Sequence, residues 1–289
     1  MPIQAIIPVI LHYFYKEELP MKQYEKLSIR DHFMFGKVCQ DVKNSQIILS
    51  ALLNKEVHLA KSSVEHYMQE YKHNKYIRLD LLAKDDEGNI YNAELQNKSS
   101  NPERQAELPY RSRYYQSLID SVFVKEGLDY INIPETYIIF ICTFDPFGLG
   151  LPQYTIQSTC LETDIPNYND RSHKIFFNTT ADLSLLPLAT RNMLKYIENN
   201  TVNDASTQHI DTIVHNAIEK EIWKEDYMLT VVHDRDVFRD GYASRQSEVD
   251  ALEATIADKD AALADKDATL ADKDAIIAQL QAQLEALKK

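Results

Sequence analysis

Three residues between positions 75 and 98 have types and a spacing that suit metal-assisted chemistry. Asp80 is a single carboxylate among the apolar residues of one extended segment, and Glu94 and Gln96 lie two apart in the next. The sequence DDEGN at 85–89 predicts a turn between the two segments. Because side chains alternate along a strand, Glu94 and Gln96 share a face, and the folded hairpin can bring Asp80 to them. Two carboxylates that meet at the edge of an apolar sheet are costly without a cation, so the hairpin predicts a divalent metal site.

The same carboxylates, taken by themselves, are also typical of an exposed surface hairpin. However, an aspartate, a hairpin and then Glu-x-Lys or Glu-x-Gln is the arrangement of the PD-(D/E)XK nucleases. Four further segments, in order, resemble the Rpn family of recombination-promoting nucleases and transposases. They are LSIRDHFMFGK at 27–37, RSRYYQSLID at 111–120, YIIFICTFDPFGLGL at 137–151 and KIFFNT at 174–179. This ordered set covers roughly residues 24–245 and is far more specific than the triplet alone.

The resemblance implies a DNA endonuclease that depends on Mg²⁺ or Mn²⁺. Asp80 and Glu94 would hold the metal, with the Leu95 carbonyl as a further ligand, because hard cations prefer oxygen. The metal would generate or orient a hydroxide and neutralise charge that develops on the phosphate. Gln96 stands where the broader superfamily has a lysine, and an amide can orient a water but supplies no positive charge. Lys98 would reach the same face if the strand continued, which makes it a candidate substitute.

A second set of residues suits contact with a phosphate backbone. Arg111 and Tyr115 are four apart on one face of a predicted helix, which starts near Pro102 and kinks or restarts at Pro109. Such residues position nucleic acid without reading its sequence. The alternative is that the arginines pair with the abundant acidic residues while the tyrosines pack. The full set of nucleic-acid-binding candidates is Arg78, Lys98, Arg104, Arg111, Arg113, Tyr115 and Gln116.

Three residues near the predicted site have more than one interpretation. Asp31 either caps the helix that follows it or adds a third carboxylate to the metal site. Arg78, two residues before Asp80 on the same strand face, is either its ion-pair partner or a phosphate contact. His32, like the other histidines, has no metal-ligand spacing, and we expect it to be solvated or hydrogen-bonded.

Charge and cysteine content limit the possible partners and compartment. The 289 residues carry a net charge of −13 and a pI of about 5.1, so nucleic acid is not attracted by the chain as a whole. Any DNA contact must therefore come from a local basic patch or from the metal. Three widely spaced cysteines predict neither a zinc site nor a disulfide framework and fit a reducing, cytoplasmic compartment. No run is long enough to span a membrane.

The order of the predicted elements indicates an α/β fold, a restriction-endonuclease-like mixed sheet core flanked by helices and followed by a helical coiled-coil tail. The run TYIIFIC at 136–142 predicts a strand buried on both faces, and a second strand is predicted at 174–177. Helices are predicted at 31–54, from 102 to about 126, at 186–198 with Pro187 in the first turn, and over 210–237. The expected divisions are an N-terminal extension at 1–20, a nuclease-like domain at 21–237 and the tail at 238–289. We expect the extension either to precede the authentic start at Met21 or to form an extra strand or disordered arm.

The tail contains a heptad repeat, ADKDAAL, ADKDATL, ADKDAII, which begins at residue 257. One core position is apolar or aromatic throughout: Tyr242, Val249, Ile256, Leu263, Leu270, Ile277 and Leu284. The other holds Phe238, Arg245, Leu252, Lys259, Lys266, Lys273, Leu280 and Leu287. A strict seven-residue repeat predicts a left-handed coiled coil, and its core lysines favour a low oligomeric state, so we expect a homodimer. The alternative is a long, solvated single helix.

Two functions of different classes follow. The first is a metal-dependent DNA endonuclease of the Rpn or transposase-like type, which hydrolyses phosphodiester bonds in recombination, mobile-element movement or phage defence. The alternative is a catalytically weak or inactive protein of the nuclease fold that acts as a coiled-coil oligomerisation module. The acidic net charge and Gln96 favour the alternative, and the D…ExQ arrangement favours the enzyme. Phosphate contacts do not reveal the sugar, so RNA is a further possible substrate of the same site.

Overall fold

The computed structural model describes residues 22–63, 66–68, 77–98, 102–124, 127, 129–162 and 168–287. The predicted N-terminal extension at 1–20 lies outside these residues. The chain forms two compact units, Met1–Tyr227 and Met228–Lys289. The first unit contains the sheet and all the residues that were predicted to do chemistry.

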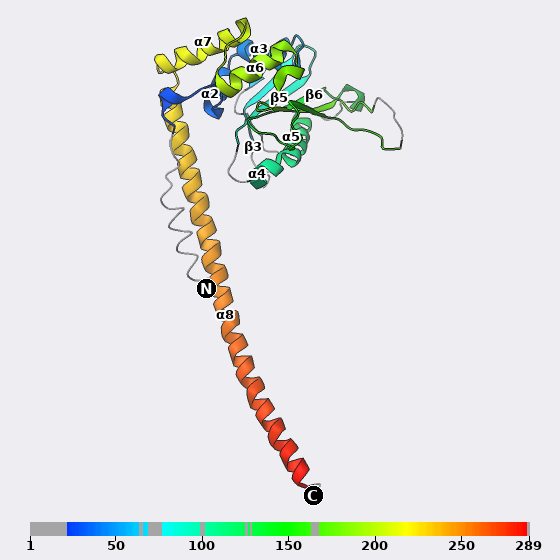
Figure 1. Ribbon diagram of the computed structural model, residues 1–289, viewed down its shortest axis with the longest axis vertical. Coiled ribbons are helices and arrows are strands. Elements are labelled where there is room, and N and C mark those ends of the chain that lie inside the picture. Colours follow the sequence, from blue (N-terminus) through cyan, green and yellow to red (C-terminus); the bar gives the residue numbers. More distant parts are fainter. Residues whose placement is uncertain are drawn as a thin grey trace. The chain divides into compact units, whose positions relative to one another are not determined.

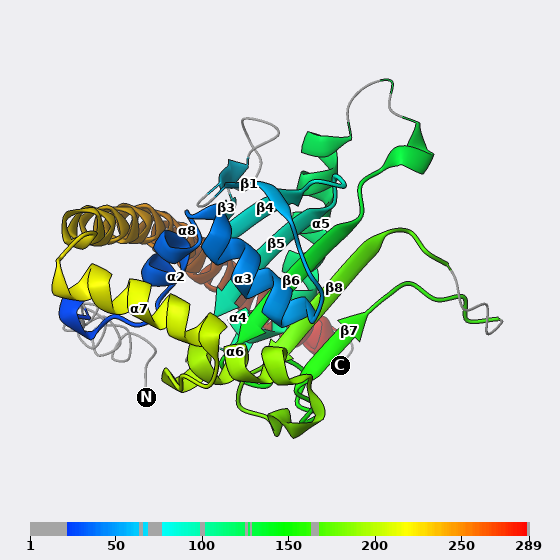
Figure 2. The ribbon, with the colours of Figure 1, turned by 90° about the horizontal axis from the view of Figure 1, so that it is seen from above.

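A six-stranded mixed sheet is the centre of the first unit, with strands in the order β1, β4, β5, β6, β8, β7 (Figure 2). β5, β6 and β8 run parallel, whereas β1, β4 and β7 each pair antiparallel with a neighbour. The strands are Leu59–Ser63 (β1), Leu81–Asp85 (β4), Ile90–Gln96 (β5), Thr136–Cys142 (β6), Gln153–Ile156 (β7) and Ser172–Asn178 (β8). A second, two-stranded antiparallel sheet consists of His66–Met68 (β2) and Ile77–Leu79 (β3). The predicted mixed α/β core is therefore present.

Alternation along the strands separates two hydrophobic cores. Tyr91, Ala93 and Leu95 of β5 point to the larger core, where they pack with α2 (His32–Val38), α3 (Val42–Leu53), α6 (Leu188–Asn199) and α7 (Ala205–Glu219). The smaller core lies on the other face of the sheet, against α5 (Leu108–Phe123). Figure 1 shows α3 and α6 on one side of the sheet and α5 on the other.

The face of β5 that meets α5 is apolar at its start and polar at its end. Ile90 belongs to the smaller core, and it is followed on the same face by Asn92, Glu94 and Gln96. Asn92 and Glu94 are buried, and Gln96 is half-buried. A column of polar side chains therefore lies between the sheet and the helix that carries Arg111. Polar side chains in such a position need partners or a ligand.

Several predicted helices differ from the structure in their limits. The helix expected at 31–54 is two helices, because the chain turns at 39–41 and the Asp41 carboxylate accepts the Asn44 N–H at 3.1 Å, which starts α3. The restart at Pro109 is confirmed: α4 is Pro102–Ala106, and α5 begins at Leu108 with the proline in its first turn. α5 ends at Phe123, three residues earlier than expected. Pro187 precedes α6 as its N-cap, outside the first turn.

The helix expected at 210–237 is also interrupted. α7 ends at Glu219, and Glu221 adopts a left-handed backbone conformation with φ of 50° before α8 begins at Lys224. Short 3₁₀ turns complete the first unit at Tyr24–Lys26 (η2), Tyr130–Asn132 (η3) and Leu183–Leu185 (η4).

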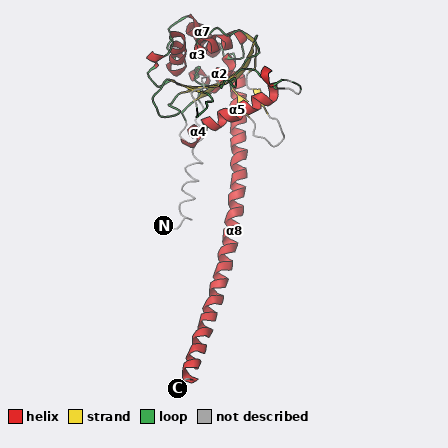
Figure 3. Ribbon diagram, turned by 90° about the vertical axis from the view of Figure 1, so that its right-hand side faces the viewer, coloured by secondary structure: helices red, strands yellow, loops and turns green. Residues whose placement is uncertain are grey.

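The second unit, from Met228 onward, consists of most of α8 (Lys224–Leu287; Figure 3). The predicted helical tail is thus a helix. Among its described side chains, the apolar residues at the two predicted core positions are exposed: Val249, Leu252, Ile256, Leu263, Leu270, Ile277 and Leu280. No helix in the described part of the chain is both long enough and apolar enough to cross a membrane.

Candidate active site

The hairpin of β4 and β5 brings Asp80 to Glu94. Asp80 lies in the bend between β3 and β4, and its main-chain N–H donates to Glu94 Oε1 at 3.1 Å. In the other direction, Oδ2 of Asp80 accepts the Leu95 main-chain N–H at 2.9 Å. The two carboxylates predicted to meet therefore do so, near the carboxyl end of β5. Ligands in open α/β sheets bind at this end of the parallel strands.

The Glu94 carboxylate is buried, with 2% of its surface exposed. Its Oε1 accepts a second hydrogen bond from the Asn92 side chain at 2.9 Å, whereas Oε2 has Arg111 Nη2 at 3.9 Å. Burial, followed by the negative charge of Asp80, raises the pKa of Glu94 well above its ordinary value, against the opposing effect of these donors. A buried carboxylate next to a second carboxylate weakens the fold, and such arrangements are concentrated at functional sites.

His32 contacts Asp80 and was not predicted to belong to the site. It is the first residue of α2, and its Nδ1 lies 3.2 Å from Asp80 Oδ2. Nearly half of its side-chain surface, 48%, is exposed. The expectation of a solvated or hydrogen-bonded histidine is therefore confirmed, although its partner at the candidate site was not foreseen. Its place next to Asp31 in the family-like segment was the available signal, but the contact depends on where α2 packs against the hairpin.

Arg111 and Tyr115 reach the same place from α5. Arg111 Nη1 donates to Gln96 Oε1 at 2.7 Å, and Nη2 donates to the Tyr115 hydroxyl at 2.8 Å. The predicted shared helix face is confirmed. Gln96 in turn donates to the Leu95 carbonyl at 2.8 Å. The result is one connected set of side chains on β5 and α5, with a guanidinium beside two carboxylates.

The other predicted residues do not join this set. Asp31 precedes α2, but its carboxylate makes no cap and instead accepts the Ser28 N–H and the Lys22 ammonium, each at 2.7 Å. Among the described residues, no three His, Cys, Asp or Glu side chains are grouped to hold a metal ion. Asp31 thus occupies the predicted N-cap position without the predicted capping bond, and its role as a third carboxylate stays a prediction.

The remaining nucleic-acid candidates divide into three cases. Lys98 follows the end of β5 at Gln96 with an exposed side chain, so the condition that the strand continues is not met. Arg113 is exposed on α5, and Gln116 is bonded to Asp120 and Ser172. The side chains of Arg78 and Arg104 lie outside the described part of the structure.

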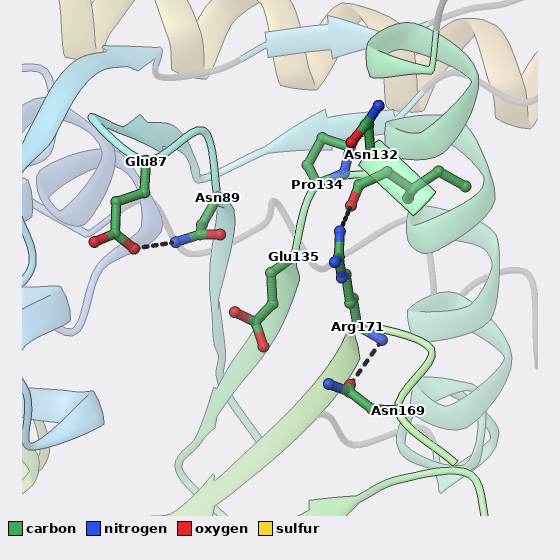
Figure 4. A pocket seen from close by; sticks show the side chains of 8 residues that line it. Glu87, Asn89, Asn132, Pro134, Glu135, Asn169 and Arg171 are labelled. Carbon is green, nitrogen blue, oxygen red and sulfur yellow. Dashed lines mark hydrogen bonds between the residues drawn. The ribbon is translucent and has the colours of Figure 1, made fainter. Parts of the chain in front are cut away.

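A pocket of about 350 Å³ lies at the opposite end of the parallel strands (Figure 4). Its charged groups already have partners. Arg171 donates to the carbonyls of Ile131 and Ile133, at 2.8 and 2.9 Å, and Glu135 lies 2.6 Å from His173. These contacts fix the loops where β6 and β8 begin, so the site at Asp80 and Glu94 remains the better candidate for chemistry.

A family model described as PD-(D/E)XK nuclease family transposase matches residues 32–176. The match extends over half of the chain, from the first residue of α2 into β8, and includes both carboxylates and Arg111. No curated protein and no solved structure matches the chain. The similarity therefore covers the residues that form the candidate site and ends before α8.

Proposed function

The chain belongs to the PD-(D/E)XK nuclease family transposases, and on that basis we propose that it is a metal-dependent endonuclease that hydrolyses phosphodiester bonds in DNA. The observation that carries this proposal is the contact between Asp80 and the buried Glu94 on the hairpin. Two carboxylates are held here by main-chain hydrogen bonds in a family whose members cleave nucleic acid. Recombination, mobile-element movement and phage defence are all compatible contexts.

The donor atoms present fit a hard divalent cation. Asp80 Oδ1 and Glu94 Oε2 accept no hydrogen bond from the described residues, and the Leu95 carbonyl has a second lone pair beyond the one that Gln96 uses. Mg²⁺ and Mn²⁺ prefer such oxygen ligands and usually retain several waters, so two carboxylates and a carbonyl are sufficient. Asp80, Glu94 and Leu95 would therefore hold the ion. When bound, it supplies Lewis-acid activation of water and of the phosphate.

The surrounding side chains fix these ligands before substrate arrives. Asn92 holds one oxygen of Glu94, and His32 contacts the oxygen of Asp80 that already accepts the Leu95 N–H. Gln96 bridges the Leu95 carbonyl and the Arg111 guanidinium. Partners of this kind restrict ligand orientation and typically change metal affinity or activity by ~10–100-fold when removed.

We further propose that α8 joins two copies of the chain in a homodimer. Its apolar stripe is exposed over the described part of the second unit, and Leu263, for example, has 57% of its surface exposed. The lysines of the repeat have aspartates only as direct neighbours, with none three or four residues away, so they cannot form ion pairs along their own helix. A second helix provides both a cover for the stripe and partners for the lysines. Two sites per dimer would allow cleavage of both DNA strands.

Cleavage of supercoiled plasmid in Mg²⁺, Mn²⁺ or Ca²⁺ tests the enzymatic proposal. We expect nicked and linear products with the wild-type chain in Mg²⁺ or Mn²⁺, and none in Ca²⁺ or with Asp80→Ala, Glu94→Ala or Gln96→Ala. Circular dichroism of each variant checks that the fold is retained. Undiminished cutting by the Glu94 variant would overturn the site assignment.

The second candidate function, an inactive oligomerisation module on the same fold, is favoured by the amide at Gln96 in place of lysine. Thermal unfolding with added metal separates the two candidates without a substrate. A site that binds metal gains about 2.7 kcal/mol of unfolding free energy when the ion is at a hundredfold excess over its Kd. If the site is inert, added metal should raise the unfolding free energy of the wild type no more than it raises that of Asp80→Ala.

A further inference from the structure

The guanidinium of Arg111 is held rigidly beside the two carboxylates. It donates to Gln96 at 2.7 Å and to Tyr115 at 2.8 Å, and it lies over the rings of Tyr115 and Phe140, with Cζ 5.4 and 5.7 Å from their centroids. Two hydrogen bonds and two ring contacts leave little rotamer freedom to lose when a substrate binds. Such prior ordering favours stabilisation of charge that appears during a reaction.

The same guanidinium still has free donors. It carries five N–H groups, of which the described residues take up two, one for Gln96 and one for Tyr115. The contact between Arg111 Nη2 and Glu94 Oε2 is 3.9 Å long, beyond hydrogen-bond distance. The Arg111 side chain is 30% exposed. Burial lowers the pKa of Arg111, but Tyr115, Glu94 and Asp80 together raise it by more. The net shift is upward, so the group remains a cation. A group needed only to neutralise Glu94 would be expected to bond to it directly.

The position that carries lysine elsewhere in the superfamily is occupied by Gln96, and its amide oxygen accepts from Arg111. Gln96 thus points a cation from the neighbouring helix to the place where a strand lysine would lie. We propose that Arg111 is a catalytic residue that binds a non-bridging oxygen of the scissile phosphate and stabilises the charge that develops on it. This role rests on the proposed nuclease function. Gln96 and Tyr115 are its positioning residues.

A catalytic role for Arg111 and a simple contact with the DNA backbone predict different effects on the cleavage rate and on DNA affinity. A residue that only positions DNA contributes equally to the bound ground state and to the transition state, so its loss weakens binding and leaves the saturated rate intact. A residue that stabilises developing charge contributes mainly in the transition state. Its loss lowers the single-turnover rate at saturating DNA, by ~10²–10³-fold for one preorganised donor.

The test measures both quantities for Arg111→Ala, Arg111→Lys and the double variant Arg111→Ala/Gln96→Lys. Single-turnover cleavage of a labelled duplex in Mg²⁺ gives the rate, and fluorescence anisotropy in Ca²⁺ gives the Kd. We expect Arg111→Ala to lose ~10²–10³-fold in rate with less than about a threefold change in Kd. Gln96→Lys in the same chain should restore at least about tenfold of the rate, because it returns a cation to the strand. A misfolded protein would show no such rescue.

Lys84→Ala is the matched control, since it removes one positive charge from an exposed position of the same hairpin. We expect its saturated rate to equal that of the wild type. If Arg111→Ala cuts at the wild-type rate, or loses only affinity, while Asp80→Ala is inactive, the assignment of Arg111 is overturned and the nuclease function stands. If Asp80→Ala also cuts normally, the assignment of the active site to Asp80 and Glu94 fails, and the role of Arg111 fails with it. If the wild type does not cut, the proposed nuclease function itself fails.

Discussion

The main-chain N–H of Asp80 donates to a carboxylate oxygen of Glu94 at 3.1 Å, and this places two like-charged side chains together by backbone geometry. The carboxylate of Asp80 accepts in turn from the N–H of Leu95, so two reciprocal hydrogen bonds join the bend to β5. Neither carboxylate depends on a flexible side chain to reach the other. Under the proposed function, this arrangement would weaken the metal-free fold and hold the carboxylates ready for a cation.

Glu94→Gln should stabilise the metal-free protein. The pKa of Glu94 is raised by burial and by Asp80, so the folded state binds its proton more tightly than the unfolded state does. That contribution to stability is complete below the unfolded value of 4.5 and is lost as pH rises through the folded pKa. At neutral pH we therefore expect the variant to gain ~1–3 kcal/mol in unfolding free energy, measured by urea denaturation in EDTA.

Repeating the urea denaturation at several pH values tests the predicted direction of the pH dependence. The difference between Glu94→Gln and the wild type should shrink as pH falls toward 4.5. Added Mg²⁺ should stabilise the wild type and not the variant. A variant less stable than the wild type at neutral pH in EDTA would contradict the view that Glu94 is a strained, charged group.

His32→Ala should reduce cleavage without weakening the fold. The imidazole lies 3.2 Å from Asp80 and is half exposed, so its removal loosens a ligand and exposes little core. We expect a loss of ~10–100-fold in activity, restored in part by higher Mg²⁺, and a change in unfolding free energy within about 0.5 kcal/mol. His58→Ala is the control, because that histidine is exposed and pairs with Glu56.

Leu263→Asp together with Leu270→Asp should convert the proposed dimer into monomers. These residues lie at one heptad core position, where a charge would be buried against the second helix. Sedimentation velocity should give twice the monomer mass for the wild type and one monomer mass for the variant. Ala261→Asp with Ala268→Asp adds the same charge on the outer face and should remain dimeric. A monomeric wild type would instead support the solvated single helix.

Thiol labelling tests the packing of the two cores. Burial, followed by the charge of Asp80, raises the pKa of Cys39, and burial raises the pKa of Cys142 to about 12. Because the thiolate is the reactive form, both should resist Ellman's reagent in the folded protein at pH 8. Cys160 is only partly buried and should react first. In buffer we expect one fast-reacting thiol in the wild type and none in Cys160→Ser. In denaturant, all three thiols of the wild type should react.

The sequence predicted those parts of the fold in which local pattern and burial agree. TYIIFIC has the limits of β6, because a continuous apolar run of β-branched residues fits only a strand covered on both faces. The hairpin followed from the DDEGN turn, and the start of α5 followed from Pro109. β1 and β7 were missed because LAKSS and QYTI lack a clear alternation and lie at the sheet edges.

The rest of the candidate site depends on contacts between segments distant in sequence. His32 and Asp80 are separated by 48 positions, and Arg111 lies 15 positions after its acceptor Gln96. Spacing gave the shared face of Arg111 and Tyr115, but the direction of that face depends on how α5 packs against β5 and β6. The strand ends before Lys98 for a similar reason, since the Asn97 side chain bonds with Arg30, which is distant in sequence.

The most direct test of the proposed active site is single-turnover hydrolysis of an end-labelled duplex, with the wild type compared with Asp80→Asn and Glu94→Gln. Each variant keeps the shape of the side chain and removes one negative charge. We expect strand cleavage by the wild type in Mg²⁺, none in EDTA, and a rate at least about a thousandfold lower for each variant. Cleavage by either variant at the wild-type rate, or by the wild type in EDTA, would contradict the claim that Asp80 and Glu94 form a metal-dependent active site.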